Sequence, residues 1–255
     1  MNFITPKQAK DHPKTAICET HGEYEVKLSE PLFDRVFVST CFECAKEGNE
    51  RRELEEVKRQ ESETKDRMEM AWNNAGVSKR LFDKGFNDFI DDTEGKAHAK
   101  RAAMGLCDAI KGNRNTGSII MNGGVGTGKT ALCTSIIKEL AFIKRVRMIK
   151  AVDMIRSLKG TWSRDNDATE AGLIEFYSRL DLLVIDEVGV QFGSDTEKMF
   201  MFDIIDGRYQ EMKPTILISN LAIAGIKDLI GERVIDRLRE DGGKLVSFDW
   251  PSYRS

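Results

Sequence analysis

The sequence predicts an α/β domain with a parallel sheet, preceded by a small cysteine-containing unit and a charged helix. Apolar strand-like runs alternate with helix-forming runs from residue 117 to residue 249, as in a parallel α/β sheet. A glycine-rich loop at 123–130 lies between one such strand and one such helix. Two Cys/His pairs lie near the start, and 255 residues suffice for one large domain with a small appendage. We place the boundaries at 1–48, 49–75 and 76–255.

Composition excludes several classes of protein. The net charge of −3 argues against nonspecific nucleic-acid binding by bulk charge, so any DNA contact needs a local basic surface or several subunits side by side. The sequence has no apolar run of about 18 residues, which excludes a helical membrane span. Residues 1–7 lack the apolar stretch of a signal peptide, so we expect a cytoplasmic protein. Five cysteines in a reducing compartment make a disulfide framework improbable.

The first unit contains a pattern typical of a zinc site. Cys18 and His21 are followed, 19 residues later, by Cys41 and Cys44, which matches two pairs of tetrahedral Zn²⁺ ligands. The intervening residues 24–38 can form a hairpin ending in a short strand. A piece this short cannot bury enough surface to fold alone, whereas zinc binding supplies about 10 kcal/mol. The alternative is four unrelated side chains on a loose arm.

Two segments separate this unit from the glycine-rich loop. Residues 49–75 have dense mixed charge with opposite charges four residues apart and a thin apolar stripe, which predicts a solvated helix joining two domains or a helix that binds a partner. The aromatic residues within 76–90 lack helical spacing and predict either an entry segment packed against a nucleotide site or plain core. A helix follows, with Thr93 as its N-cap and Gly112 at C′.

The glycine-rich loop fits the phosphate-binding pattern G-x-x-x-x-G-K-[ST]. A buried strand at 117–122 precedes it and a helix at 131–142 follows it, as this motif requires. The glycines allow the backbone N–H groups to turn inward around a triphosphate at the N-terminus of the helix. Lys129 is expected to reach the terminal phosphates and the Thr130 hydroxyl to bind Mg²⁺. The alternative is a glycine-rich turn with a stray lysine. The predicted nucleotide-binding residues are Gly123, Gly124, Val125, Gly126, Thr127, Gly128, Lys129, Thr130 and Ala131.

The rest of the chain continues the α/β alternation. Four further strands are expected at 146–150, 182–187, 215–220 and 245–249. Helices are expected at 153–162 with Asp153 as its cap, at 168–180, at 194–209 with a capping box that begins at Ser194, and over 231–239.

Polar residues at the ends of two of these strands are candidates for catalysis. Asp186 and Glu187 end an apolar strand, where Asp186 can hold Mg²⁺ and Glu187 can polarise the water that attacks the γ-phosphate. Asn220 can hydrogen-bond the γ-phosphate or that water, or it is simply a turn residue. Arg233 and Arg237, four residues apart on one helix face, can clamp a developing phosphoryl charge or form a solvated surface.

Taken together, several of these motifs resemble those of the DnaC-type bacterial and phage helicase loaders, which are AAA+ ATPases. The resemblance covers residues 76–255. It implies five parallel strands between helices, and subunits that assemble into an open spiral. The residues that carry it are the loop 124–130, the pair Asp186-Glu187, Asn220, residues 231–238 and residues 249–254.

The resemblance also implies roles for matching positions. Lys129 and Thr130 match the phosphate and Mg²⁺ ligands, Asp186 the acid on the metal side, and Glu187 the catalytic base. Asn220 matches the first sensor. Arg237 matches the arginine finger that enters a neighbouring subunit's site, and Arg233 is the second candidate. Arg254 matches the second sensor, which contacts the chain's own nucleotide.

Loaders carry an element that touches single-stranded DNA where the helix 153–162 falls. The candidate DNA contacts are therefore Lys150, Arg156, Lys159 and Arg164.

The function we expect from this resemblance is ATP-dependent helicase loading. The zinc unit would bind a DnaB-type replicative helicase, and the ATPase domain would capture single-stranded DNA and deliver the helicase onto it at replication initiation. ATP would be hydrolysed at subunit interfaces, and the cofactors are ATP, Mg²⁺ and Zn²⁺. The main alternative is an IstB-like ATPase helper of a DNA transposase. A zinc-containing DNA-binding regulator with a nucleotide switch and a phosphate-transferring kinase are further alternatives.

Overall fold

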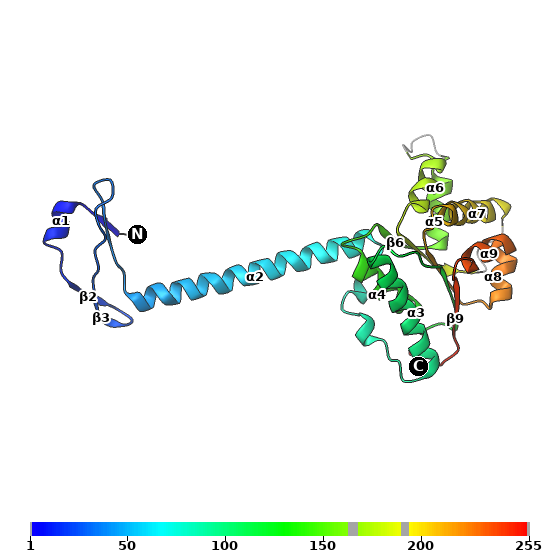
Figure 1. Cartoon of the computed structure of the whole chain (residues 1–255), viewed down its shortest axis with the longest axis horizontal. Coiled ribbons are helices and arrows are strands. Elements are labelled where there is room, and N and C mark those ends of the chain that lie inside the picture. The colour runs from blue at the N-terminus through cyan, green and yellow to red at the C-terminus, as the bar shows by residue number, and fades with distance from the viewer. Residues whose placement is uncertain (1, 163–167, 190–193, 254–255) are drawn as a thin grey trace. The chain divides into compact units, whose positions relative to one another are not determined.

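The chain divides into two compact units between Asp66 and Arg67 (Figure 1). The computed structural model describes residues 2–162, 168–189 and 194–253. Within these ranges, no helix has the length and the apolar character needed to cross a membrane.

The first unit contains two small antiparallel sheets. Strand β1 pairs with β4, and β2 pairs with β3, so the predicted strand at 36–38 is confirmed. The predicted hairpin over 24–38 is present in its later part, where the isolated antiparallel bridges Leu28–Val38 and Leu32–Arg35 join its two arms. Strand β3 pairs with β2 instead. The elements are β1 (Asn2–Ile4), α1 (Pro6–Lys10), β2 (Thr15–Cys18), β3 (Gly22–Glu25) and β4 (Val36–Val38).

The charged helix α2 spans Phe42–Asn74 and contains no buried residue. This confirms the predicted solvated helix, but it begins at Phe42 rather than at residue 49. Arg59 pairs with Glu56 and Glu63 on its surface. The earlier start places Cys44 in the first helical turn.

The second unit is built on a five-stranded sheet in which every pair of neighbouring strands is parallel. The predicted α/β fold is therefore confirmed. The strand order is β6 (Val146–Lys150), β7 (Leu182–Val188), β8 (Thr215–Ser219), β5 (Ile119–Gly123) and β9 (Lys244–Phe248).

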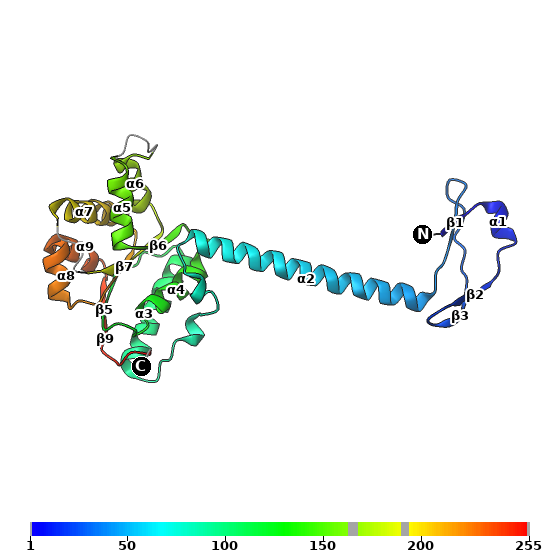
Figure 2. The same cartoon turned by 180° about the vertical axis from the view of Figure 1, so that it is seen from behind.

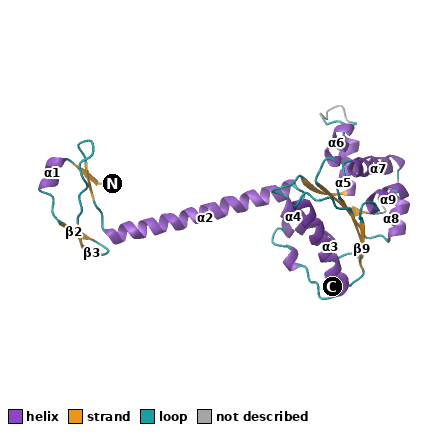
Figure 3. Ribbon diagram, viewed as in Figure 1, coloured by secondary structure: helices purple, strands orange, loops and turns teal. Residues whose placement is uncertain are grey.

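Helices cover both faces of this sheet, as Figures 1 and 2 show from opposite sides and Figure 3 shows by element type. Alternate residues of each strand enter different cores: Ile119 and Met121 lie in one cluster, and Ile120 lies in the other. Both faces are buried, so the strands read as continuous apolar runs. One face carries α3 (Glu94–Lys111) and α4 (Lys129–Leu140); the other carries α5 (Ala151–Gly160), α6 (Glu170–Ser178), α7 (Asp195–Gln210), α8 (Ile223–Ile230) and α9 (Glu232–Arg239).

The predicted elements of the sheet domain are observed, with boundaries that differ by no more than two residues. The N-cap at Thr93 and the capping box at Ser194 are confirmed. Asp153 is not a cap, because α5 begins at Ala151, directly after β6. Gly112 is the C-cap with φ −83°, and Asn113 takes the left-handed conformation instead. The polar break predicted at 163–167 lies outside the described residues.

Helix α8 was not predicted from the sequence. Its N-cap, Ala222, provides no side-chain hydrogen bond, so the sequence lacks the polar residue that usually marks a helix start.

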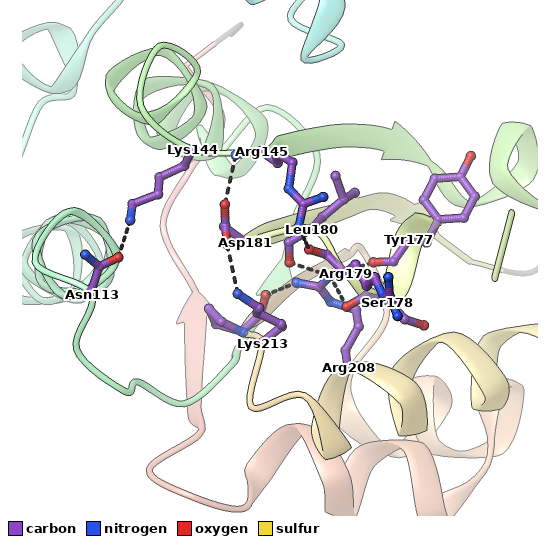
Figure 4. A network of polar contacts seen from close by, with 11 residues as sticks. Asn113, Lys144, Arg145, Tyr177, Ser178, Arg179, Leu180, Asp181, Arg208 and Lys213 are labelled. Atoms are coloured by element: carbon purple, nitrogen blue, oxygen red, sulfur yellow. Dashed lines mark hydrogen bonds and ion pairs between the residues drawn. The ribbon is translucent and has the colours of Figure 1, made fainter. Parts of the chain in front are cut away.

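A buried arginine joins the ends of several elements on the side of the sheet where the strands begin (Figure 4). Arg208 of α7 is 1% exposed. Burial lowers the pKa of its guanidinium to about 9, opposed by the charge of Asp181, so it remains charged at neutral pH. The guanidinium donates hydrogen bonds to the carbonyls of Tyr177, Ser178, Leu180 and Pro214 and to the Thr215 hydroxyl.

Candidate functional site

The glycine-rich loop leaves the carboxyl end of β5 and leads directly into α4. Gly123, Gly126 and Gly128 have φ values of 135°, 78° and 95°, a region that side chains disfavour. A Cβ on Gly123 would also lie 2.4 Å from the carbonyl oxygen of Phe248. These positions therefore require glycine, and they shape a loop whose last residues form the first turn of a helix.

The predicted phosphate-binding lysine lies inside this loop. Lys129 is only 5% exposed, and its ammonium donates to the carbonyls of Gly123 at 2.7 Å and Gly124 at 2.6 Å. Burial lowers the pKa of Lys129, and the charge of Asp186 opposes this shift. The ammonium thus occupies the concave side of the loop and is held by main-chain oxygens that a phosphate can replace.

The two predicted Mg²⁺ ligands are adjacent. The Thr130 hydroxyl donates to Asp186 Oδ2 at 3.0 Å, and Asp186 Oδ1 accepts from the backbone N–H of Glu187 at 2.8 Å. Burial raises the pKa of the Asp186 carboxyl, although these hydrogen bonds oppose the shift. A hydroxyl and a carboxylate side by side form an oxygen donor set that suits Mg²⁺.

Glu187 extends from the same strand end in an unusual backbone conformation. Its φ is 57°, and the register of β7 against β8 shifts between Ile185 and Val188. The Glu187 carboxylate is half exposed and forms an ion pair with Lys150 at 2.9 Å. The hydrogen bond to Glu187 raises the pKa of Lys150. Lys150, which the sequence analysis assigned to DNA contact, therefore belongs to this site.

A cavity of about 980 Å³ brings these residues together. Asn220, directly after β8, also lines this cavity. The aromatic residues within 76–90 fit both interpretations: Phe89 lines the cavity and also belongs to the core, and Phe82 and Phe86 pack against that core.

The sequence analysis missed two residues after β9. The Trp250 indole N–H donates to the carbonyl of Thr127 at 2.9 Å, and the Tyr253 backbone N–H donates to that of Gly126 at 2.9 Å. Both belong to the 249–254 motif, which was used only for Arg254. Arg254 itself lies outside the described residues.

The candidate arginine finger does not line the nucleotide cavity of its own chain. Arg237 of α9 donates to Asp206 at 3.1 Å and lies over the ring of Tyr209, 4.2 Å from its centroid. It lines a separate cavity of about 100 Å³ that also includes Arg208. Arg233 is exposed on the same helix. Any contact of Arg237 with nucleotide would thus involve another subunit.

The remaining candidate DNA contacts are engaged in ion pairs. Arg156 pairs with Asp153 at 3.3 Å, and Lys159 pairs with Glu197 at 2.8 Å. Arg164 lies outside the described residues. Arg156 and Lys159 remain partly exposed, and their contact with DNA stays a prediction.

The four predicted zinc ligands form one cluster in the first unit. The ligand atoms of Cys18, His21, Cys41 and Cys44 all lie within 4.8 Å of one another. His21 Nδ1 lies 3.3–3.7 Å from the three sulfurs, so Nδ1 is the atom that faces a metal. Its other nitrogen, Nε2, lies 3.2 Å from Glu47, an arrangement that fixes the ring of a metal-bound histidine. Three sulfurs and one nitrogen suit tetrahedral Zn²⁺.

Local hydrogen bonds prepare one of these thiols for metal binding. The backbone N–H groups of His21 and Thr20 lower the pKa of the Cys18 thiol to about 6. The thiolate is the form that binds metal, and these hydrogen bonds favour it at Cys18.

Comparisons with known proteins identify the family. The family described as IstB-like ATP binding protein matches residues 51–254. The matched region begins after the four clustered Cys and His residues of the first unit. The chain is 33% identical to the replicative helicase loader DnaC of Buchnera aphidicola subsp. Schizaphis graminum, over 74% of this chain and 76% of that protein. It is 34% identical to DnaC of Escherichia coli K12, over 74% and 76% of the two chains.

A solved structure agrees with the observed fold. The crystal structure of the DnaC helicase loader superposes with a TM-score of 0.57 at 20% identity and covers 67% of this chain and 99% of that one. Together with the strand order and the phosphate loop, these matches show that the chain belongs to the IstB/DnaC-type family of AAA+ ATP-binding proteins.

Proposed function

We propose that this protein is an ATP-dependent loader of a DnaB-type replicative helicase. The observation that carries the proposal is one cavity that combines the phosphate loop, the Thr130–Asp186 pair and Glu187 in a chain similar to replicative helicase loaders. Nucleotide binding is the property of the family. Hydrolysis, helicase delivery and the role of each residue are parts of the proposal.

In the proposed mechanism, ATP places its polyphosphate in the loop. Lys129 then exchanges the carbonyls of Gly123 and Gly124 for phosphate oxygens. Thr130 and Asp186 hold Mg²⁺, which when bound neutralises phosphate charge. Glu187, once free of Lys150, orients and deprotonates the attacking water.

We assign completion of the site to a second copy of the chain. Asn220 contacts the γ-phosphate or the attacking water within one subunit. Arg237 reaches into the site of the neighbouring subunit and stabilises the transferred charge, and Arg254 contacts the nucleotide of its own subunit. ATP thereby favours assembly into an open spiral.

We assign helicase binding to the first unit. With Zn²⁺ bound by its four ligands, it binds the DnaB-type ring, while the ATPase unit captures single-stranded DNA and delivers it to the opened ring. The alternative of a transposase helper has less support, because the relatives described above are replicative helicase loaders. Copurification of the full chain with a replicative helicase or with a transposase distinguishes the two.

Arg237→Ala tests the shared site. The variant should bind ATP normally and lose hydrolysis stimulated by single-stranded DNA, because the charge on the transferred phosphoryl group is no longer stabilised. Arg239→Ala, an exposed arginine of the same helix, is the matched control and should retain stimulation. Normal stimulated hydrolysis by Arg237→Ala would show that the assignment is wrong.

A further inference from the structure

The segment that follows β9 is hydrogen-bonded to the main chain of the phosphate loop. The Trp250 indole donates to the Thr127 carbonyl, and the Tyr253 backbone N–H donates to the Gly126 carbonyl, both at 2.9 Å. These bonds join residues more than 120 positions apart in the sequence. They reach the loop at the two residues just before Gly128, where α4 is about to begin.

Hydrogen bonds to these two carbonyls also orient two N–H groups. In a trans peptide the C=O and the following N–H lie in one plane and point in opposite directions. The Gly126 carbonyl shares its plane with the N–H of Thr127, and the Thr127 carbonyl shares its plane with that of Gly128. Holding both carbonyls toward the C-terminal segment therefore turns both N–H groups the other way, into the loop.

The other carbonyl contacts of the loop are of a different kind. Lys129 holds the carbonyls of Gly123 and Gly124, but in the proposed mechanism it leaves them for phosphate. The contacts from Trp250 and Tyr253 do not involve the Lys129 ammonium. They can persist when the loop is occupied.

Ring contacts hold this segment in place. Trp250 packs against Phe248 with centroids 4.7 Å apart, and Tyr253 packs edge-on against Phe89 at 6.3 Å. The Tyr253 hydroxyl donates to the carbonyl of Ile90 at 3.1 Å. The rings of Phe89 and Tyr253 also abut Gly128, because a Cβ there would lie 3.0 and 3.2 Å from them.

We propose that Trp250 and Tyr253 are positioning residues that preorganise the phosphate loop for the polyphosphate of a nucleoside di- or triphosphate. They act through the main chain of Gly126 and Thr127 and touch no phosphate themselves. The inference rests on the proposed nucleotide site and deepens it.

Trp250→Phe tests this proposal, because it keeps an aromatic ring against Phe248 and removes the indole donor. We expect the affinity for a non-hydrolysable ATP analogue with Mg²⁺ to fall about 5-fold, the factor that one ordinary hydrogen bond represents. In steady state the KM for ATP should rise by a similar factor, with kcat within about twofold, because the same contacts act on the ground state and the transition state. Tyr253→Phe, which removes only an exposed hydroxyl contact, should weaken binding about 2-fold.

Trp72→Phe is the matched control. The Trp72 indole also donates to a backbone carbonyl, that of Lys138 at 3.2 Å, but Lys138 lies outside the phosphate loop. A thermal melt without nucleotide accounts for any loss of stability common to both tryptophan variants. A folded Trp250→Phe variant that binds the analogue as tightly as wild type overturns the inference alone. If the wild-type chain binds no nucleotide, the proposed site fails and the inference falls with it.

Discussion

Replacing Arg208 with Met is expected to destabilise the ATPase unit strongly. The substitution keeps much of the apolar length of the side chain but removes every hydrogen bond that the Arg208 guanidinium donates (Figure 4). Three carbonyls, those of Tyr177, Leu180 and Pro214, lie 2.5–2.9 Å from the guanidinium. Each then loses a charged donor in a buried environment.

The expected cost follows from these three carbonyls. A buried acceptor left without a partner costs about 1–3 kcal/mol, which gives an upper range of about 3–9 kcal/mol for three. Two effects reduce this sum. Water can enter and hydrogen-bond the carbonyls, and the variant no longer bears the cost of burying a charged guanidinium. We therefore expect the free energy of unfolding to fall by about 3 kcal/mol.

Urea denaturation followed by tryptophan fluorescence measures this loss. All three tryptophans lie in the second unit, so the signal is independent of the first. The denaturant slope should not change, because the variant exposes the same surface on unfolding. Arg179→Met is the control: this arginine is exposed and forms an exposed ion pair with Glu175, so the variant should lose less than about 0.5 kcal/mol. An Arg208→Met variant as stable as this control would refute the reasoning.

Four further predictions concern charge and metal. Lys150→Ala should raise basal ATP hydrolysis about 2–5-fold, measured as phosphate release, because a half-exposed ion pair of about 0.5–1 kcal/mol no longer holds Glu187; a slower variant would contradict this. The pKa of Asp181 is lowered because hydrogen bonds from Lys213 and Arg145 outweigh its burial. The lowered pKa means that ionised Asp181 stabilises the folded state at pH values above its unfolded pKa, and this stabilisation is lost as the pH falls through its folded pKa. Asp181→Asn should therefore make the free energy of unfolding less dependent on pH in the acid range. An unchanged pH dependence would show that Asp181 does not contribute. Chelation of zinc should abolish the circular dichroism of the first unit's strands, and Glu47→Ala should weaken zinc binding about 10-fold in a chelator competition; equal affinity would show that Glu47 does not orient His21.

Contiguous motifs were predictable because their chemistry depends on local spacing. The phosphate loop carries its own strand, turn and helix start, and the four zinc ligands lie in two tight pairs. Apolar strand-like runs alternate with helix-forming runs, and this alternation was enough to predict a parallel sheet covered by helices. The strands are apolar throughout because successive residues of each strand enter the cores on opposite faces of the sheet.

The partners of these motifs depend on strand order, which local spacing does not encode. Lys150 was assigned to DNA contact, but β6 lies beside β7 in a register that places Lys150 opposite Asp186 and hence next to Glu187. Similarly, Gly123 pairs with Phe248 across β5 and β9, so the segment after β9 runs alongside the phosphate loop. Only the fold brings these residues together.

The sequence by itself therefore determined the class of fold and the positions of the glycine-rich loop, the acidic pair and the four Cys/His residues that cluster in the first unit. The tertiary structure decided which residues contact those groups. Lys150 forms an ion pair with Glu187, and Trp250 and Tyr253 donate hydrogen bonds to the loop. Arg208 donates to carbonyls at the end of the sheet where the strands begin. The physical reason is that a binding motif is a local arrangement of backbone and side chains. The contacts that orient it join residues distant in sequence, and they exist only once the parallel strands have taken their order and register.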